Sequence, residues 1–523
     1  MKSKLLEKYE NVEGFEKITF GKLLNRWADL YDNKIAIKDS KEKVTYRELQ
    51  RESKLMANRL ACFGIRKNDI VLLQCINTPF FVKVLFGFFQ LGAIPVLVLP
   101  AHRETEIIKL LEKTNAVAYI APREYMGFEY SSISKCIKEY SAEICCLDEQ
   151  SFLNNSCDTA SAVEAGTEIE YDDVALLLLS GGTTGEPKLI PRTHADYIYN
   201  AKMAAKRGKM DMHSVYLAAM PMSHNMTLSS PGILGTLCVG GTVTMCPIPS
   251  PDEILEIIEE ESVTITGLVP AVASLCVELL EIDDFDMSSV ETVVIGGARM
   301  DEKLARNIIK SFQCKLQNQY GTAEGLIMST SLEDEDEVII KCQGKPISTV
   351  DEIRIVNDKG EILSQGEQGE IEVRGLYTIT RYYNEEDSYE HFTDDGFYKT
   401  GDKALKDENG NYRVFGRARE IINRAGEKLL PSEIESELMR IEGIEKVTVV
   451  PVEDSLLGQK SCAFIEKSAD CYLDRKQIST LMLDNGVAQY KIPDMIQFIN
   501  IWPVTKMNKI DIVKLKQLAA EKK

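Results

Sequence analysis

The fold is decided by the stretch Ala175-Leu176-Leu177-Leu178-Leu179-Ser180-Gly181-Gly182-Thr183-Thr184-Gly185-Glu186-Pro187-Lys188. The apolar run predicts a buried strand, and a glycine-rich loop follows it. Glycine allows backbone N–H groups to converge on an anion, the hydroxyls add donors, and Lys188 adds a positive charge. The loop suits nucleotide phosphates, although it matches neither a Walker A loop nor a GxGxxG loop. A plain turn between two strands is the alternative interpretation.

Working outward, short aliphatic runs alternate with segments of helical spacing. We expect buried strands at Val71–Ile76, Ile94–Leu99 and Ala116–Ala121, with helices at Pro79–Leu91 and Glu104–Asn115. The same rhythm recurs at Asp173–Leu179, Val215–Met220, Val263–Leu268 and Val290–Ile295. This order predicts an α/β fold of two lobes with parallel sheets covered by helices.

The pattern of expected secondary structure changes after about Gly344. Alternating strands at Glu352–Val356 and Glu370–Val373 predict an antiparallel, barrel-like section. A smaller α+β unit follows, in which Ser432 and Glu435 are typical of a capping box at a helix start. We therefore predict a large domain over residues 1–416 and a small mobile domain over residues 417–523.

Composition narrows the class of protein. The net charge of -20 disfavours non-specific nucleic-acid binding, which needs clustered Lys and Arg. The longest apolar stretch, Phe80 to Leu99, is broken by Lys83, Gly92 and Pro95, so we expect no membrane span. The 13 cysteines show no regular spacing and are interpreted as reduced thiols of a cytoplasmic protein.

Five motifs stand in order along the chain. They are Ser180–Lys188, Gln319-Tyr320-Gly321-Thr322-Ala323-Glu324, Tyr398-Lys399-Thr400-Gly401-Asp402, Gly416-Arg417-Ala418-Arg419-Glu420 and Pro503–Lys509. Together they resemble the signatures of the adenylate-forming superfamily, which includes acyl-CoA synthetases, nonribosomal adenylation domains and luciferases. The resemblance spans essentially the whole chain.

The resemblance implies an ATP site and assigns it residues. Glu324 would bind Mg²⁺, Asp402 would accept the ribose hydroxyls, and Arg417 would donate to ribose or phosphate. The other nucleotide-binding residues would be Ser180, Gly181, Gly182, Thr183, Thr184, Gly185, Lys188, Gly297, Ala298, Tyr320, Gly321 and Thr322. Tyr320 would stack on the adenine.

The resemblance also assigns roles in the small domain. Lys509 would contact the attacking carboxylate and the α-phosphate as the catalytic lysine, and Arg419 would be the hinge. In a second step a thiol attacks the adenylate, and Gly426 would line the thiol tunnel. No carrier site of the Gly-Gly-x-Ser kind follows Lys509, so the thiol is expected from another chain.

The segment Pro221–Gly232 carries the substrate prediction. It resembles the acid-binding segment of stand-alone 2,3-dihydroxybenzoate–AMP ligases of siderophore biosynthesis. That resemblance implies that His224 is a catalytic residue beside the carboxylate of the acid. It also implies that Asn225 and Ser230 bind the two hydroxyls of the acid. Gly297 and Ile327 would line the same pocket. Met226 and Ile327 depart from the usual aromatic residue and Val, which leaves another benzoate open.

We therefore expect an aryl-acid–AMP ligase that uses ATP and Mg²⁺. It would activate 2,3-dihydroxybenzoate, release pyrophosphate, and load the phosphopantetheine arm of an aryl carrier protein in siderophore or nonribosomal peptide biosynthesis. The alternatives are adenylation of salicylate or 4-hydroxybenzoate, a benzoate-type ligase that uses coenzyme A, and a non-catalytic nucleotide-binding protein.

Overall fold

The computed structural model describes residues 9–154, 168–180, 188–298, 300, 302–384, 386, 388, 390–417, 422–468, 472–503 and 510–521. Two compact units make up the chain. The first comprises the chain up to Pro100, Lys113–Ser180 and Lys188–Gly416, and the second comprises Ala101–Glu112 and the chain from Arg417 onward.

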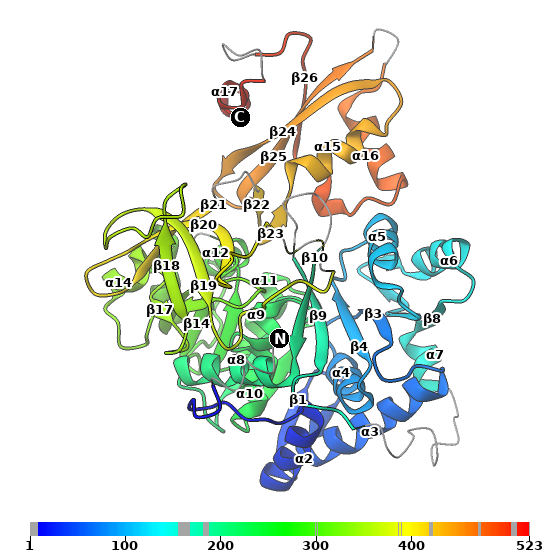
Figure 1. Cartoon of the computed structure of the whole chain (residues 1–523), viewed down its shortest axis with the longest axis vertical. Helices are drawn as coiled ribbons and strands as arrows, with labels where there is room; N and C mark the ends of the chain where they lie inside the picture. The colour runs from blue at the N-terminus through cyan, green and yellow to red at the C-terminus, as the bar shows by residue number, and fades with distance from the viewer. Residues whose placement is uncertain are drawn as a thin grey trace. The chain divides into compact units, whose positions relative to one another are not determined.

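The first unit contains a six-stranded sheet of order β10-β9-β4-β3-β5-β8 (Figure 1). Its strands are β3 (Ile70–Gln74), β4 (Ile94–Val98), β5 (Ala118–Ala121), β8 (Cys145–Asp148), β9 (Val174–Ser180) and β10 (Lys188–Thr193). The pairings β3–β4, β3–β5, β4–β9 and β5–β8 are parallel, whereas β9 and β10 are antiparallel. The predicted parallel lobe is confirmed.

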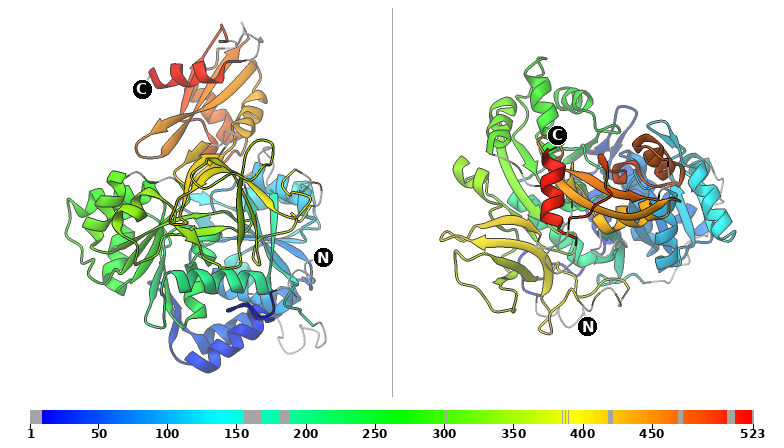
Figure 2. Two further views of the ribbon diagram at one scale, coloured as in Figure 1. Left: turned by 60° about the vertical axis from the view of Figure 1, so that its left-hand side comes forward. Right: turned by 90° about the horizontal axis from the view of Figure 1, so that it is seen from above.

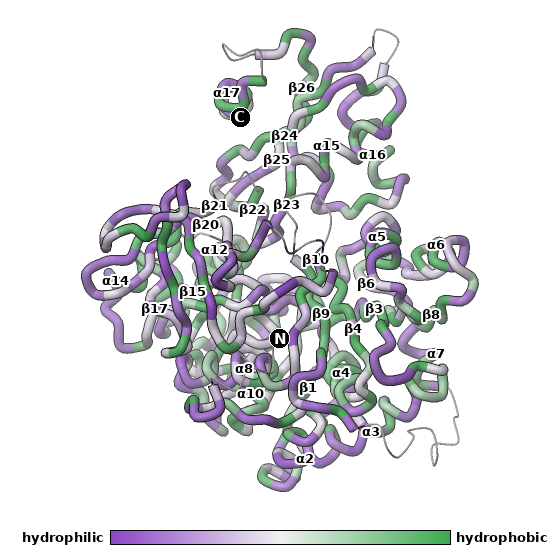
Figure 3. The backbone as a smooth tube through the Cα atoms, viewed as in Figure 1, coloured by the Kyte–Doolittle hydropathy of each residue, from purple (hydrophilic) through white to green (hydrophobic). Residues whose placement is uncertain are grey.

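Helices and short segments lie between or next to these strands in the chain. They are α3 (Tyr46–Cys62), α4 (Pro79–Leu91), α5 (Glu104–Thr114), α6 (Ser131–Tyr140), α7 (Glu149–Asn154), and the small hairpin β6 (Glu124–Tyr125) and β7 (Phe128–Glu129). One of them, α5, belongs mostly to the second unit. Helix α4 matches its predicted bounds because Pro79 suits the first helical turn and Gly92 closes the end in a left-handed conformation. Nearly all of α4 is buried, and it is the apolar helix beside β3 and β4 in Figure 3. No helix within the described ranges is long and apolar enough to cross a membrane.

A nine-stranded sheet of order β17-β16-β15-β14-β13-β11-β12-β1-β2 forms the second lobe. Its strands are β1 (Ile35–Lys38), β2 (Lys43–Thr45), β11 (Val215–Ala218), β12 (Thr242–Met245), β13 (Ile265–Leu268), β14 (Thr292–Ile295), β15 (Lys315–Gly321), β16 (Ile327–Ser329) and β17 (Lys345–Pro346). Helix α2 (Phe20–Tyr31) precedes β1 in the chain and packs on α3 and α4. The other helices of this part of the chain are α8 (His194–Arg207), α9 (Asn225–Ser229), α10 (Gly232–Cys238), α11 (Pro251–Glu261), α12 (Pro270–Leu280), α13 (Glu302–Phe312) and α14 (Asp336–Lys341). One buried cluster, which includes Phe20, Phe86, Tyr197 and Tyr216, joins the two lobes into a single core.

The section after Gly344 is a four-stranded sheet of order β18-β19-β20-β21. It consists of β18 (Glu352–Val356), β19 (Gly369–Arg374), β20 (Tyr398–Lys406) and β21 (Tyr412–Arg417). The pairings β18–β19 and β19–β20 are antiparallel, as predicted. The right-hand view of Figure 2 shows these yellow strands as a section of their own.

The second unit is an α+β fold around a five-stranded sheet in which β26 pairs in parallel with β25. Its elements are β22 (Ile422–Arg424), β23 (Glu427–Leu429), α15 (Pro431–Met439), β24 (Ile444–Asp454), β25 (Gly458–Lys467), α16 (Arg475–Asp484), the 3₁₀ helix η2 (Gln489–Lys491), β26 (Met495–Phe498) and α17 (Ile512–Glu521). The predicted cap at Ser432 is wrong. Helix α15 already begins at Pro431 after Leu430, because proline suits the first helical position, and Glu435 instead accepts from Val449 N.

Ten described cysteines carry free thiols. Cys62 is disulfide-bonded, so the expectation that every thiol is reduced is wrong.

Asp351 lies just before β18 among hydroxyl groups. Tyr377 donates to its Oδ2 at 2.8 Å, and its Oδ1 is buried with no hydrogen-bond partner within the described residues. Loss of water around the carboxyl raises the pKa of Asp351 to about 8, because burial penalises the charged form more than the hydroxyls favour it. Asp351 is therefore protonated at neutral pH in the folded chain.

We predict that Asp351→Asn stabilises the protein at pH 8. An unfolded Asp ionises near pH 3.9, so the stability contributed by the neutral carboxyl is complete below that pH and is lost as pH rises towards 8. The free energy of unfolding from urea titration should rise by about 1–3 kcal/mol at pH 8 and change little at pH 4. Asp358→Asn in the exposed β18 turn is the control. An equal gain at both pH values would contradict a buried neutral carboxyl.

Candidate active site

Three predicted segments follow the same edge of the nine-stranded sheet. Strands β11, β13, β14 and β15 are mutually parallel, so their carboxyl ends meet at one edge. Residues 224–230 follow β11, and Gly297 and Ala298 follow β14. Strand β15 ends with Tyr320 and Gly321, and Thr322 comes directly after it. Ligands of open α/β sheets bind outside the carboxyl ends of the strands. The fold therefore gathers these segments where a ligand is expected.

Direct contacts confirm that the segments meet. Gln319 Nε2 donates to Ser230 O at 3.1 Å. The Sδ atom of Met226 lies against Gly296, where an added Cβ would come within 2.9 Å of the sulfur. Gly297 has a φ of +81°, which favours glycine at this turn. Met226 thus forms a wall at the ends of β13 and β14, since its Cε also faces Gly267.

The predicted phosphate loop begins and ends in a hairpin. Ser180 at the end of β9 pairs directly with Lys188 at the start of β10. Gly181, Gly182, Thr183, Thr184 and Gly185 lie outside the described residues. Lys188 is only 3% exposed, and its Nζ lies 5.2 Å from the ring centroid of Tyr382, within range of a cation–π contact. The hairpin therefore fixes where the loop's cation lies.

Glu324 is a buried carboxylate held by a tyrosine. Its Oε1 accepts from the Tyr382 hydroxyl at 3.0 Å, and the Tyr398 hydroxyl lies 3.4 Å from that of Tyr382. Burial, followed by the charge of Glu324, raises the pKa of Tyr382 far above its usual value, so its hydroxyl is a permanent donor. One oxygen of Glu324 is thereby oriented.

The main chain around Glu324 is tightly packed. Ile379 N donates to Glu324 O at 2.8 Å, and the Thr378 hydroxyl donates to Gly325 O at 3.1 Å. From the other side, Arg192 donates through Nη1 to Ala323 O at 2.9 Å while its Nε bonds Asp196. This arginine and its partner aspartate are fully buried. The turn that carries Glu324 is therefore clamped by two segments of the chain.

Asp402 is aimed by a bulge in β20. Glu372 pairs with Lys399 and Glu370 with Lys403, so β20 has two more residues than β19 in this interval. Gly401 adopts a φ of +73°, and Thr400 bonds Ile371 O and Asp402 N across the irregularity. Asp402 is 5% exposed, and its Oδ2 accepts from Tyr320 at 2.6 Å. The bulge brings two predicted nucleotide-binding residues together.

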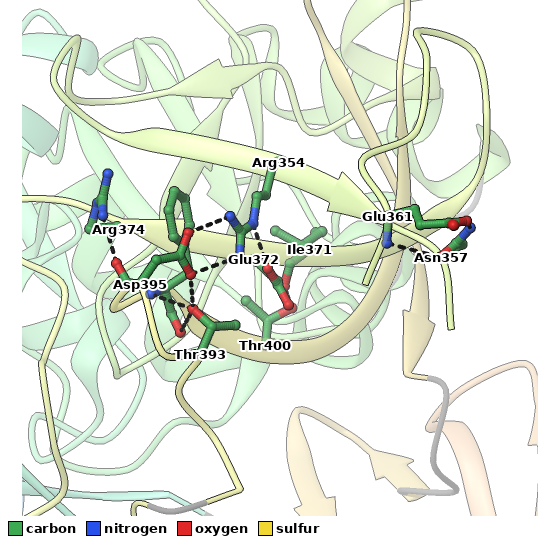
Figure 4. A network of polar contacts seen from close by, with 10 residues as sticks. Arg354, Asn357, Glu361, Ile371, Glu372, Arg374, Thr393, Asp395 and Thr400 are labelled. Atoms are coloured by element: carbon green, nitrogen blue, oxygen red, sulfur yellow. Dashed lines mark hydrogen bonds and ion pairs between the residues drawn. The ribbon is translucent and has the colours of Figure 1, made fainter. Parts of the chain in front are cut away.

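A charged network braces these strands (Figure 4). Arg354 donates to Glu372 at 2.6 Å and to both carboxyl oxygens of Asp395 at 2.7 and 3.1 Å. The guanidinium carbons of Arg354 and Arg374 lie 4.0 and 4.4 Å from the ring centroid of Phe397, one residue before β20. The network holds the start of β20 against β19, and so it supports the bulge at Asp402.

The predicted acid-binding residues sit at the start and end of α9. Asn225 Oδ1 accepts from the Tyr197 hydroxyl at 2.8 Å, which leaves the amide nitrogen as the group that can meet a ligand. Ser230 is 2% exposed, and its Oγ has no hydrogen-bond partner among the described residues. A buried hydroxyl without a partner is costly, and a bound ligand would satisfy it. Helix α9 therefore starts at an amide with a free nitrogen donor position and is followed by a buried hydroxyl without a partner among the described residues.

His224 is exposed, and its Nδ1 accepts from Met226 N at 3.3 Å as the cap of α9. Its proton is then assigned to Nε2. Ile327 is buried in β16 among Tyr199, Leu376 and Tyr377. Its Cγ1 lies 3.4 Å from the position of a Cβ on Gly321.

The remaining predicted residues belong to the second unit or its border. Arg417 ends β21, and Gly426 turns between β22 and β23 with a φ of +92°. Arg419 and Lys509 lie outside the described residues. Their assignments stay predictions.

Sequence reasoning missed Tyr382, Tyr197 and Arg192. A tyrosine carries no motif of its own, and these side chains reach Glu324, Asn225 and Ala323 only through tertiary folding. The one usable signal was the charged Arg192 in an apolar strand beside Asp196, because buried charges are usually paired.

We predict that Gly325→Ala destabilises the protein more than Gly360→Ala. Both glycines have positive φ, but a Cβ on Gly325 would lie 2.2 Å from Tyr377 O, whereas one on Gly360 meets nothing within 4 Å. Strain and overpacking should cost about 3–5 kcal/mol at Gly325, against about 1 kcal/mol at Gly360. Urea unfolding measures both values. An equal loss of unfolding free energy in the two variants would show that the Tyr377–Thr378 backbone moves easily to make room for the added methyl group.

Comparisons with known proteins identify the family of the chain. The AMP-binding enzyme family matches residues 24–383. The 2,3-dihydroxybenzoate-AMP ligase of Bacillus subtilis (strain 168) is 39% identical over 96% of this chain and 94% of that protein. The salicyl-AMP ligase / salicyl-S-ArCP synthetase of Mycobacterium tuberculosis is 34% identical over 93% of this chain and 87% of that protein. The apo structure of MbtA from Mycobacterium smegmatis superimposes with a TM-score of 0.74 at 32% identity, covering 98% of this chain and 97% of that one. The resemblance seen in the motifs is thus confirmed, and the chain belongs to the AMP-binding enzyme family.

Proposed function

We propose that this chain is an aryl-acid–AMP ligase. It activates an aromatic carboxylic acid, 2,3-dihydroxybenzoate as the first choice, with ATP and releases pyrophosphate. It then transfers the acyl group to the phosphopantetheine thiol of an aryl carrier protein in siderophore or nonribosomal peptide biosynthesis. The observation that carries the choice of acid is the buried Ser230 hydroxyl, which has no partner among the described residues and follows the helix that begins at Asn225.

The two residues proposed to bind the ring hydroxyls of the acid are neutral and polar. Asn225 can donate its amide hydrogens to an ortho oxygen, and Ser230 can pair with a second hydroxyl. An α-amino acid would need an anion for its ammonium group, and neither of these residues carries a charge. The Nε2 proton of His224 suits a carboxylate, because Nδ1 is already occupied by the α9 cap.

The residues of the first unit fit a nucleotide with its metal. Among the described residues no group of three or more His, Cys, Asp and Glu side chains could hold a metal. A single oriented carboxylate, Glu324, matches Mg²⁺, which protein sites hold by one or two carboxylates together with substrate phosphates. The ion would neutralise phosphate charge. Asp402 would accept the ribose hydroxyls, and Lys188 would stabilise the phosphates.

The second unit would complete the reaction. Lys509 would contact the carboxylate and the α-phosphate, Arg419 would serve as hinge, and Gly426 would admit the thiol arm. We place the protein in the cytoplasm, where carrier proteins and ATP are present. The alternative acceptor is coenzyme A, with the same first half-reaction.

The deciding experiment is ATP–pyrophosphate exchange with a panel of acids. The panel contains 2,3-dihydroxybenzoate, salicylate, 4-hydroxybenzoate, benzoate, an aliphatic acid and several amino acids. We expect the fastest exchange with 2,3-dihydroxybenzoate. A best rate with an amino acid or aliphatic acid would refute the aryl assignment, and no exchange with any acid would favour a non-catalytic nucleotide-binding protein. Supplying holo carrier protein or coenzyme A in a second assay separates the two acceptors.

We further predict that Ser230→Cys shifts preference towards salicylate. A thiol is a weaker hydrogen-bond partner than a hydroxyl, so the acid with the second hydroxyl loses more. The ratio of kcat/KM for 2,3-dihydroxybenzoate over salicylate should fall about tenfold. Ser229→Cys is the matched control, because Asn200 already bonds that neighbouring hydroxyl. An unchanged ratio would remove Ser230 from the pocket.

A further inference from the structure

His391 lies next to the proposed phosphate-binding lysine but belongs to none of the five motifs. Its Nε2 contacts Lys188 Nζ. Its ring also meets the Tyr382 ring edge-to-face, with centroids 5.6 Å apart at an interplanar angle of 87°. Lys188 Nζ lies over the face of that same tyrosine. Histidine and tyrosine thus flank one ammonium group.

The backbone holds His391 in this position. His391 N donates to Ser388 O at 3.0 Å, and its carbonyl accepts from Lys399 N at 2.8 Å in β20. Phe392 forms an isolated bridge with Tyr398, and Tyr383 N donates to Leu189 O at 2.9 Å beside Lys188. The segment that carries His391 is therefore tied both to β20, which carries Asp402, and to β10, which carries Lys188.

The chemistry of the contact fixes its direction. An ammonium group has only donors, so towards a charged Lys188 the Nε2 atom of His391 acts as the acceptor, which assigns the imidazole proton to Nδ1. Neither the imidazole nor the phenol ring of Tyr382 is negatively charged. These two contacts therefore orient the Lys188 ammonium without neutralising it. A carboxylate in the same place would compete with phosphate for the lysine.

We propose that His391 is a positioning residue for Lys188, which it holds ready for the phosphates of ATP through its neutral Nε2. This inference rests on the proposed function and adds a residue outside the family motifs. Tyr382 links the two charged parts of the site, because its ring faces Lys188 while its hydroxyl orients Glu324. His391 packs against that tyrosine and accepts from the lysine, so it stabilises this arrangement from the side of β20.

The test compares three variants of the full chain. His391→Ala removes the acceptor, His391→Phe keeps an aromatic ring without an acceptor, and His391→Gln offers an amide oxygen at nearly the reach of Nε2. Loss of one hydrogen bond to a charged group should raise KM for ATP about tenfold to a hundredfold in the Ala and Phe variants. The Gln variant should recover most of that loss, and KM for the acid should change little in all three.

Several outcomes would overturn the inference. An unchanged KM for ATP in the His391→Phe variant would do so. An equal rise of KM for ATP in the His391→Phe and His391→Gln variants would also do so, because it would mean that His391 acts as a cation or only by its shape. His213→Gln, at an exposed histidine, is the control. If the His391→Ala variant does not fold, the comparison of His391→Phe with His391→Gln still decides.

Calorimetric titration with MgATP alone separates this inference from the proposed function, because ATP affinity is measured without any acid. A wild type that binds MgATP but activates no acid would refute the function and leave the role of His391 measurable.

Discussion

Two-sided burial of parallel strands is the constraint on which this protein depends. Strands β3, β4 and β5 are buried along their whole length, and so are β13 and β14. Such strands accept almost only apolar side chains. Polar and charged side chains that bind a ligand must therefore lie beyond the end of each strand. The site follows this rule. Its residues stand directly after β9, β11, β14 and β15, where the backbone leaves the core.

The antiparallel additions to this parallel frame give the site its charged groups. Strand β10 folds back on β9 and places Lys188 opposite Ser180. Strand β16 folds back on β15 through the turn that carries Glu324. The bulge of β20 aims Asp402 at Tyr320. Each charged group therefore lies where regular strand pairing is interrupted. Each also contacts a neutral tyrosine, and Tyr382 contacts both Lys188 and Glu324.

Neutral partners are suited to a site that must bind a highly charged ligand. A tyrosine or histidine orients a charged side chain without itself carrying an opposite charge. Two groups of saturated ion pairs among the described residues support the backbone next to these side chains. Arg354 with Asp395 and Glu372 braces the strand that leads to Asp402, and Arg192 with Asp196 braces the turn of Glu324. Among the described residues, saturated charge pairs thus support the backbone of the site, and neutral side chains contact Lys188, Glu324 and Asp402.

The sequence by itself determined the α/β class, most strand and helix positions, and the reaction class, because apolar periodicity and contiguous motifs are local properties of the chain. Helix α4 and the strand before the glycine-rich loop were predictable for that reason. Tertiary structure alone decided which side chains complete each motif. Tyr382, His391 and Tyr197 are far in sequence from the groups they contact, and no local pattern marks them. It also decided that the Asn225 amide oxygen accepts from Tyr197 and that the Ser230 hydroxyl has no partner among the described residues, since a hydrogen bond depends on where distant atoms come to lie.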